Sequence, residues 1–188
     1  MSIGKLADAM RNAELLYDEQ ALDEVIGEMA DAIVADYSSD DVPLLFVTVM
    51  KGGLHFAAKL SFALAGRGLD VEFDYLHATR YRGRTSGSGL AWLHRPETPM
   101  RGRRVLLVDD ILDEGYTLQA VQRWCEDQNA RDVRIAVLTE KRHDRRIEGV
   151  EADYCGVEVP ERYVFGYGLD YHEQGRNLPA IYALVDCR

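Results

Sequence analysis

Short apolar runs alternate with stretches of helical spacing along the chain, and this alternation predicts an α/β fold with a mainly parallel central sheet flanked by helices. Short runs rich in Val and Leu suit strands that are buried on both faces. The expected strands are Pro43 to Met50, Val71 to Thr79, Leu90 to Leu93, Val105 to Val108 and Val133 to Thr139.

Apolar positions that recur near a spacing of 3.6 residues predict the helices. About residues 5–38 are expected to be helical, as are Leu54 to Ala65 and about residues 117–128. The segment Arg80 to Gly89 is basic and rich in glycine and serine, so we expect a mobile loop there. Two further segments are expected to be short and irregular: Tyr154 to Val159 and Tyr163 to Gly168.

Size, charge and cysteine content narrow the class of protein. With 188 residues and 47% hydrophobic residues, the chain suits a single domain with an ordinary core. Its net charge of −10 disfavours binding to nucleic acid. The apolar runs are far below the ~20 residues that span a bilayer, and no signal peptide is visible. The odd, widely spaced cysteines suggest neither a zinc site nor a disulfide framework, so we expect a cytoplasmic protein that binds no membrane.

The candidate chemistry lies in Val105 to Leu118, which reads VLLVDDILDEGYTL. The paired carboxylates Asp109 and Asp110 follow the apolar run, and the carboxyl ends of strands in open α/β sheets are where ligands bind. Gly115 permits a tight turn, and Thr117 begins a helix whose free amides are suited to a phosphate. The segment therefore places acids a few residues from a phosphate site.

This segment resembles the motif with which the type I phosphoribosyltransferases bind phosphoribosyl diphosphate (PRPP). The resemblance implies the fold of that family, with a core at about residues 40–145 and a small hood subdomain built from the N-terminal and C-terminal segments of one domain, 1–188. It also implies a site for the ribose and the 5′-phosphate of PRPP, formed by Asp109, Asp110, Asp113, Glu114, Gly115, Tyr116 and Thr117.

Two further segments resemble family elements that bind pyrophosphate and close the site. Lys51 and Gly52 match a loop that binds pyrophosphate, which often has a cis peptide bond before the lysine, here Met50–Lys51. Arg176 matches an arginine that contacts pyrophosphate. Arg80 and Tyr81 match the flexible loop that closes over the reaction centre, although many relatives have serine at the first of these positions.

The C-terminal third resembles the 6-oxopurine branch of the family, the hypoxanthine-guanine phosphoribosyltransferases. In that branch a lysine donates to O6 of the purine, and Lys141 matches it. Tyr163 matches the aromatic ring that stacks on the base, and the backbone of Val164 would read the base edge. Asp170 would approach the exocyclic position and a second Mg²⁺. In order, the resemblance runs from about Leu44 to Arg176.

The resemblance implies transfer of a phosphoribosyl group from PRPP to hypoxanthine or guanine, giving IMP or GMP and pyrophosphate, with Mg²⁺ as cofactor. Asp113 would be the general base that accepts the proton from N7, and the adenine and orotate enzymes generally lack an acid there. Asp109, Asp110 and Asp170 are the candidate metal-binding residues. Many relatives have threonine where this chain has Glu114, so we expect the Glu114 side chain to point to solvent, away from the phosphate.

Alternatives stay open from the residues alone. One is the same chemistry with a preference for xanthine, since contacts at the 2-position of the base are not readable. Another is a PRPP-binding regulator that keeps the fold but binds RNA or DNA, which the net charge of −10 disfavours. The resemblance implies a homodimer or homotetramer, with PRPP and a 6-oxopurine as small-molecule substrates.

Overall fold

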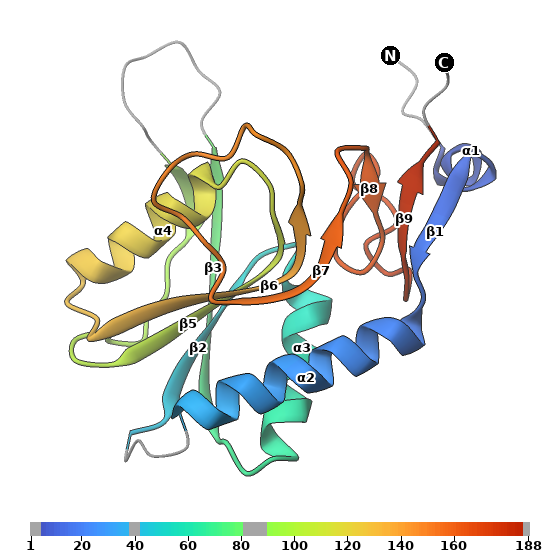
Figure 1. The fold of residues 1–188 in the computed structure, drawn as a ribbon. Helices are drawn as coiled ribbons and strands as arrows, with labels where there is room; N and C mark the ends of the chain where they lie inside the picture. Colours follow the sequence, from blue (N-terminus) through green and yellow to red (C-terminus); the bar gives the residue numbers. More distant parts are fainter. Residues whose placement is uncertain (1–4, 38–41, 81–89, 186–188) are drawn as a thin grey trace.

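Two β-sheets of unequal size organise the chain in the computed structural model, which describes residues 5–37, 42–80 and 90–185 (Figure 1). The large sheet has the strand order β4-β3-β2-β5-β6-β7, and all of its neighbouring pairs are parallel except β3 and β4. Its strands are β2 (Leu44–Val49), β3 (Val71–Arg80), β4 (Leu90–His94), β5 (Arg104–Leu112), β6 (Asp132–Lys141) and β7 (Tyr154–Val159).

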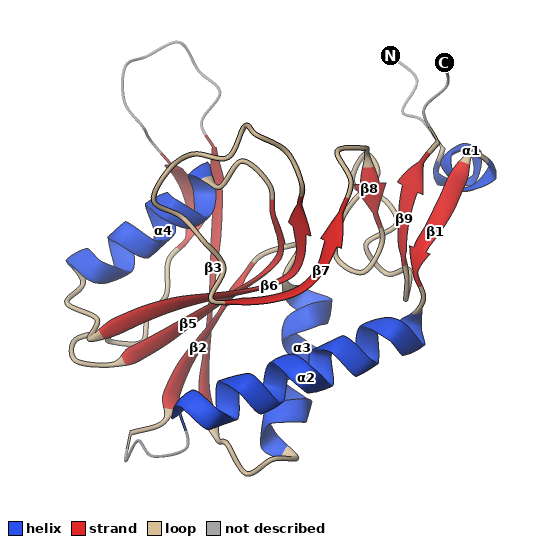
Figure 2. Cartoon of the chain, in the orientation of Figure 1, coloured by secondary structure: helices blue, strands red, loops and turns tan. Residues whose placement is uncertain are grey.

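Helices cover both faces of the large sheet, as Figure 2 shows. The helices α2 (Glu19–Tyr37) and α3 (Leu54–Ala65) pack on one face, and α4 (Tyr116–Asp127) packs on the other. Alternate residues of β5 supply the two cores, because successive side chains of a strand point to opposite faces. Leu106 lies in the α2–α3 core, and Leu107 lies in the α4 core. The parallel α/β architecture expected from the sequence is confirmed.

A small antiparallel sheet joins the two ends of the chain. It consists of β1 (Ala13–Tyr17), β9 (Ile181–Leu184) and β8 (Val164–Phe165), with α1 (Leu6–Arg11) before it. The expectation of a helix over about residues 5–38 is therefore wrong at β1. Leu15 pairs with Tyr182 in this sheet, so a partner far along the chain decides the conformation there rather than local spacing.

Two other strands differ from the sequence expectation. β5 continues to Leu112, so Asp109 and Asp110 lie within the strand rather than after it. The segment expected to be irregular at Tyr154 to Val159 is a regular strand that pairs with β6. The large sheet thus continues past residue 145, which was the expected end of the core.

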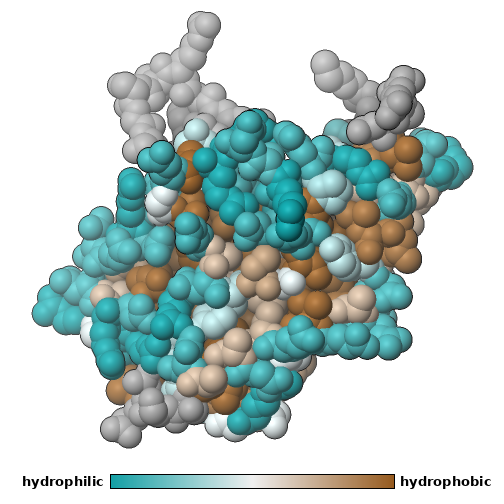
Figure 3. Space-filling model, viewed as in Figure 1, coloured by the Kyte–Doolittle hydropathy of each residue, from teal (hydrophilic) through white to brown (hydrophobic). Residues whose placement is uncertain are grey.

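The surface is largely hydrophilic on the face drawn in Figure 3, where hydrophobic residues gather over the small sheet. In the small sheet, Leu15 of β1 is about half exposed, and so is Val185, which follows β9. None of the helices in the described part of the chain is long and apolar enough to cross a membrane.

Candidate active site

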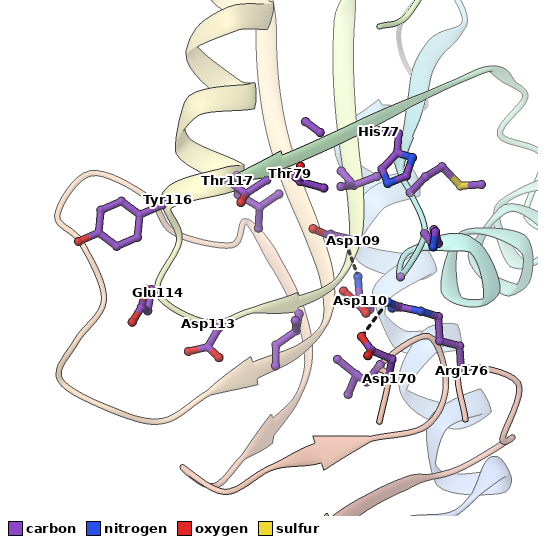
Figure 4. Close-up of a pocket in the computed structure, with 18 of the residues that line it drawn as sticks. His77, Thr79, Asp109, Asp110, Asp113, Glu114, Tyr116, Thr117, Asp170 and Arg176 are labelled. Atoms are coloured by element: carbon purple, nitrogen blue, oxygen red, sulfur yellow. Dashed lines mark hydrogen bonds and ion pairs between the residues drawn. The ribbon is translucent and has the colours of Figure 1, made fainter. Parts of the chain in front are cut away.

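A cavity of about 800 Å³ opens at the carboxyl ends of β2, β3, β5 and β6 (Figure 4). Its other wall comes from the small sheet and from residues 163–180, which lead into β8 and connect it to β9, and which together with this sheet we call the hood. The cavity brings together almost all of the residues that the sequence nominated. Those that line it are Lys51, Gly52, Asp109, Asp110, Asp113, Glu114, Gly115, Tyr116, Thr117, Lys141, Tyr163, Val164, Asp170 and Arg176.

The paired carboxylates are held in the last part of β5. The backbone N–H of Asp110 donates to Oδ1 of Asp109 at 2.9 Å, and Asp110 itself is 8% exposed. Burial and the neighbouring charge of Asp110 raise the pKa of Asp109 well above its usual range. Burial also raises the pKa of Asp110, against the opposing effect of the Arg176 guanidinium. Two such acids favour a bound cation or hydroxyl donors.

The loop after β5 turns sharply into α4. Gly115 has a φ of 88°, a left-handed conformation that L side chains rarely adopt, and it caps the helix that begins at Tyr116. Gly115, Tyr116 and Thr117 line the cavity, so the N-terminus of α4, with amides such as that of Thr117 that have no acceptor one turn earlier in the helix, lies at the cavity. This is the geometry of an anion site at a helix N-terminus.

Close packing fixes the loop that follows β2. The peptide bond Met50–Lys51 is cis, which agrees with the family pattern. A Cβ atom on Gly52 would overlap the carboxylate of Asp110, and one on Gly53 would lie 2.6 Å from the carbonyl oxygen of Val108. The absence of side chains at these two positions brings the loop backbone directly against the acidic pair.

Asp113 has a donor on each carboxylate oxygen. Nζ of Lys141, the last residue of β6, donates to Oδ2 at 2.9 Å, and Nε2 of His143 lies 2.6 Å from Oδ1. Partial burial acts to raise the pKa of Asp113, but the hydrogen bonds from Lys141 and His143 outweigh it and hold that pKa below its usual value. Asp113 is thus an ionised acceptor facing the cavity.

The hood contributes a second charged group. Arg176 donates to the carbonyl oxygen of Gly168 and to Oδ1 of Asp170, both at 2.7 Å, as Figure 4 shows for Asp170. The Lys51 ammonium lies 3.1 Å from Oε2 of Glu173, in a pair that is exposed on both sides. Lys51 and Arg176 therefore face the cavity with their charges partly balanced by acids of the hood.

The hood also supplies an aromatic ring at the cavity. Tyr163 is 44% exposed, and its ring meets that of Tyr171 edge-on at 5.5 Å. The adjacent Val164 is buried and pairs with Ala183 in the small sheet. A ring held in this way, with substantial free surface, can stack on a planar ligand.

Glu114 does not simply extend into water. Its carboxylate lies 3.1 Å from Nη1 of Arg145, and its side chain is 38% exposed. Arg145 also pairs with Glu161 at 2.7 Å. The negative charge of Glu114, at the position where many relatives have threonine, is thus balanced by Arg145.

Some lining residues were not singled out from the sequence. His77 and Thr79 on β3 and Glu173 in the hood line the cavity, and His143 contacts Asp113. Local spacing carries no signal for these residues. For His143, the only indication in the sequence was its position two residues after the candidate purine-binding residue Lys141.

Arg80 and Tyr81 were expected at a loop that closes over the site. Arg80 is the last residue of β3, and Tyr81 lies outside the described residues. The role of both residues at a closing loop stays a prediction.

The part of the chain that the structure describes holds no group of three or more His, Cys, Asp or Glu side chains arranged to bind a metal ion. The acidic pair Asp109 and Asp110 nevertheless fits Mg²⁺, which is usually bound by one or two carboxylates together with substrate phosphates. A cation bound there would reduce the repulsion between the two neighbouring carboxylates, which is one cause of the raised pKa of Asp109.

Comparison with known proteins identifies the family. Residues 12–172 match the model of the phosphoribosyl transferase domain, which is most of the chain. The protein therefore belongs to the phosphoribosyltransferase family, as the resemblance of its motifs implied.

Two named relatives are similar over nearly the whole chain. A hypoxanthine-guanine phosphoribosyltransferase of Streptococcus pneumoniae (strain ATCC BAA-255 / R6) is 34% identical over 174 residues, which are 92% of this chain and 93% of the relative. One of Aquifex aeolicus (strain VF5) is 32% identical over 177 residues, which are 94% and 97% of the two chains.

A solved structure shares the fold. The hypoxanthine phosphoribosyltransferase of Trypanosoma cruzi in complex with the product IMP superposes with a TM-score of 0.86 at 30% identity. The match covers 93% of this chain and 95% of that one. The type I phosphoribosyltransferase fold is thereby confirmed.

Proposed function

We propose that the protein converts hypoxanthine or guanine and PRPP to IMP or GMP and pyrophosphate. The observation that carries this proposal is the meeting of the PRPP motif of β5 with Lys141 and Tyr163 in one cavity. The similarity to named hypoxanthine-guanine phosphoribosyltransferases over more than nine-tenths of the chain supports it.

PRPP would lie along the acidic strand end and the start of α4. The 5′-phosphate would accept hydrogen bonds from the amides and hydroxyls between Asp113 and Thr117, where the dipole of the helix favours an anion. The carboxylates of Asp109 and Asp110 would accept from the ribose hydroxyls. Lys51, the backbone of Gly52 and Arg176 would hold pyrophosphate at the opposite side of the cavity.

The purine would lie between the hood and the end of β6. Tyr163 would stack on the base, a contact worth roughly 1–3 kcal/mol per base. Lys141 would donate to O6, the backbone of Val164 would read the base edge, and Asp170 would approach the exocyclic position. An ammonium that needs an acceptor at position 6 selects an oxo group over the amino group of adenine.

Asp113 is the proposed general base. During transfer the bond between C1′ and the pyrophosphate oxygen breaks and the bond between N9 and C1′ forms. The proton on N7 then moves to a carboxylate oxygen of Asp113, which the structure holds ionised at the cavity. The proton balance of the reaction requires such an acceptor.

We propose Mg²⁺ as the cofactor, with Asp109 and Asp110 as its protein ligands and Asp170 as a candidate ligand of a second ion. When bound, Mg²⁺ neutralises charge on the leaving pyrophosphate. Both carboxylate oxygens of Asp170 already accept hydrogen bonds, from Arg176 and from the backbone N–H of Glu173, so any ligation there shares these oxygens.

A homodimeric or homotetrameric assembly and a cytoplasmic location rest on the resemblance alone and stay predictions. The reaction itself is tested by incubating the protein with hypoxanthine, PRPP and Mg²⁺ and detecting IMP and pyrophosphate by mass spectrometry. The proposal expects both products in equal amounts. PRPP binding without either product would favour the regulatory alternative.

A further inference from the structure

Asp113 is fixed by two donors of different kinds. Lys141 reaches Oδ2 through a long flexible side chain, which is 14% exposed. His143 reaches Oδ1 at 2.6 Å with a side chain that is 0% exposed. The long side chain of Lys141 can therefore move away from Asp113, whereas the buried ring of His143 is held in place.

The hydrogen bonds of His143 define its tautomer. The backbone N–H of Arg145 donates to Nδ1 of His143 at 3.0 Å, so Nδ1 is an acceptor and carries no hydrogen in this geometry. The ring hydrogen therefore lies on Nε2, the nitrogen that faces Asp113. His143 is a donor to Asp113 and has no free nitrogen with which to take a proton from it.

We propose that His143 is a positioning residue for Asp113, which holds Oδ1 in place while Oδ2 receives the proton from the purine. This inference rests on the role proposed above for Asp113. When a 6-oxopurine binds, Lys141 is required at O6 and its contact with Oδ2 is lost, which frees that oxygen for the proton on N7. The hydrogen bond from His143 then remains to orient the carboxylate at the moment of transfer.

The other charged groups near Asp113 have partners of their own. Arg145 on the same loop pairs with Glu114 and Glu161. On β5, Asp110 lies against Gly52, and the field of Arg176 opposes the rise in its pKa. From the hood, Tyr163 faces the same cavity as a phenol, with a pKa raised by burial.

Two substitutions separate the contacts of the ring. In His143→Asn the side-chain oxygen can still accept from the N–H of Arg145, but the side chain is too short to reach Asp113. In His143→Gln the amide nitrogen extends to the position of Nε2 and can donate to Oδ1. Arg142→Ala is the matched control, because Arg142 on the same loop is exposed and pairs with Glu158 instead.

The readout is the pKa of the Asp113 carboxyl, measured by ¹³C NMR on the substrate-free protein, together with the acid limb of kcat/KM for hypoxanthine. Loss of one hydrogen bond to a charged acceptor corresponds to a shift of about one pH unit. We expect both quantities to rise by about that much in His143→Asn, to return toward the wild-type values in His143→Gln, and to stay unchanged in Arg142→Ala. We also expect kcat of His143→Asn to fall about tenfold or more, since misplacing a catalytic group costs at least that much.

An Asp113 pKa in His143→Asn equal to that of the wild type would overturn the inference. A double-mutant comparison gives a second test. A residue that acts through Asp113 has no effect once that carboxylate is gone, so His143→Asn should lower kcat in the wild type but not in Asp113→Asn. An equal loss of kcat in the two backgrounds would also overturn the inference. The NMR titration does not depend on turnover. If the pKa of Asp113 shifts in His143→Asn but kcat is unchanged in Asp113→Asn, the hydrogen bond between His143 and Asp113 is supported and the role of Asp113 as general base is not.

Discussion

Gly52 lies so close to Asp110 that a Cβ atom on residue 52 would overlap Oδ2 of the carboxylate. The hood approaches the same point, since a Cβ atom on Gly168 would overlap the carbonyl oxygen of Gly52. The segments that contain Gly52, Asp110 and Gly168 are far apart in the sequence and meet where the two glycines have no side chain. This contact fixes the pyrophosphate loop against the acidic strand end.

We expect Gly52→Ala to lower both stability and activity. The methyl group must displace either the loop or Asp110, which costs typically about 1–3 kcal/mol in a packed site. Urea unfolding and kcat/KM for PRPP measure the two effects. Gly27→Ala is the control, because its Cβ would meet its nearest atom at an ordinary 3.5 Å and alanine favours the interior of α2. Equal stability and activity in Gly52→Ala and the wild type would contradict the close packing.

Asp113→Asn should retain PRPP binding and lose turnover. The amide keeps the shape of the carboxylate but cannot accept the N7 proton, so kcat should fall by roughly 10²-fold or more, as for loss of a general base. Calorimetry with PRPP and steady-state kinetics measure the two parts. An unchanged kcat would show that Asp113 is not the general base. The control for loss of a negative charge is Glu151→Gln, because Glu151 is exposed.

Lys141→Ala should raise KM for the base far more than KM for PRPP, because the ammonium is assigned to O6 of the purine. It should also shift the acid limb of kcat/KM to higher pH, since one of the two donors that lower the pKa of Asp113 is removed. Kinetics with each substrate varied in turn give both values. Equal increases of the two KM values would argue against base recognition by Lys141, and Arg142→Ala should change neither.

Asp109→Asn should stabilise the metal-free protein while abolishing turnover. Because the folded pKa of Asp109 is raised, the folded state binds its proton more tightly than the unfolded state, and stability is lost as pH rises above the unfolded pKa of about 4. The neutral amide removes this cost and still accepts from the N–H of Asp110. Urea unfolding with EDTA should show a higher free energy of unfolding than that of the wild type at pH 7.5, and this gain should disappear near pH 4.

Glu151→Gln should show no such gain, because that acid is exposed. A loss of stability in Asp109→Asn at pH 7.5 would mean that the ionised Asp109 is well compensated in the folded state. Such a result would also count against a cation site at Asp109 and Asp110.

The central strands were predictable because their residues are buried on both faces, as Leu106 and Leu107 of β5 show. The strand β1 was not, because Leu15, Leu16 and Tyr17 fit helical spacing equally well. Its conformation is fixed by pairing with β9, whose residues lie at the other end of the chain. Local pattern cannot report such a partner.

The same distinction applies to the site. Asp109, Asp110 and Asp113 lie in one contiguous motif, so the sequence could nominate them together. His143 stands in a basic run where most side chains are solvated, and only the folded loop shows it buried against Asp113. Contacts such as Lys51 with Glu173 join segments more than 100 residues apart, which spacing along the chain does not reveal.

The measurement that tests the account most directly is the initial rate with PRPP and Mg²⁺ when hypoxanthine, guanine, xanthine and adenine are offered separately. The account predicts turnover of hypoxanthine or guanine and none of adenine, with the kcat/KM ratios giving the preference among 6-oxopurines. Turnover of adenine at a rate comparable to hypoxanthine, or of no base at all, would contradict it.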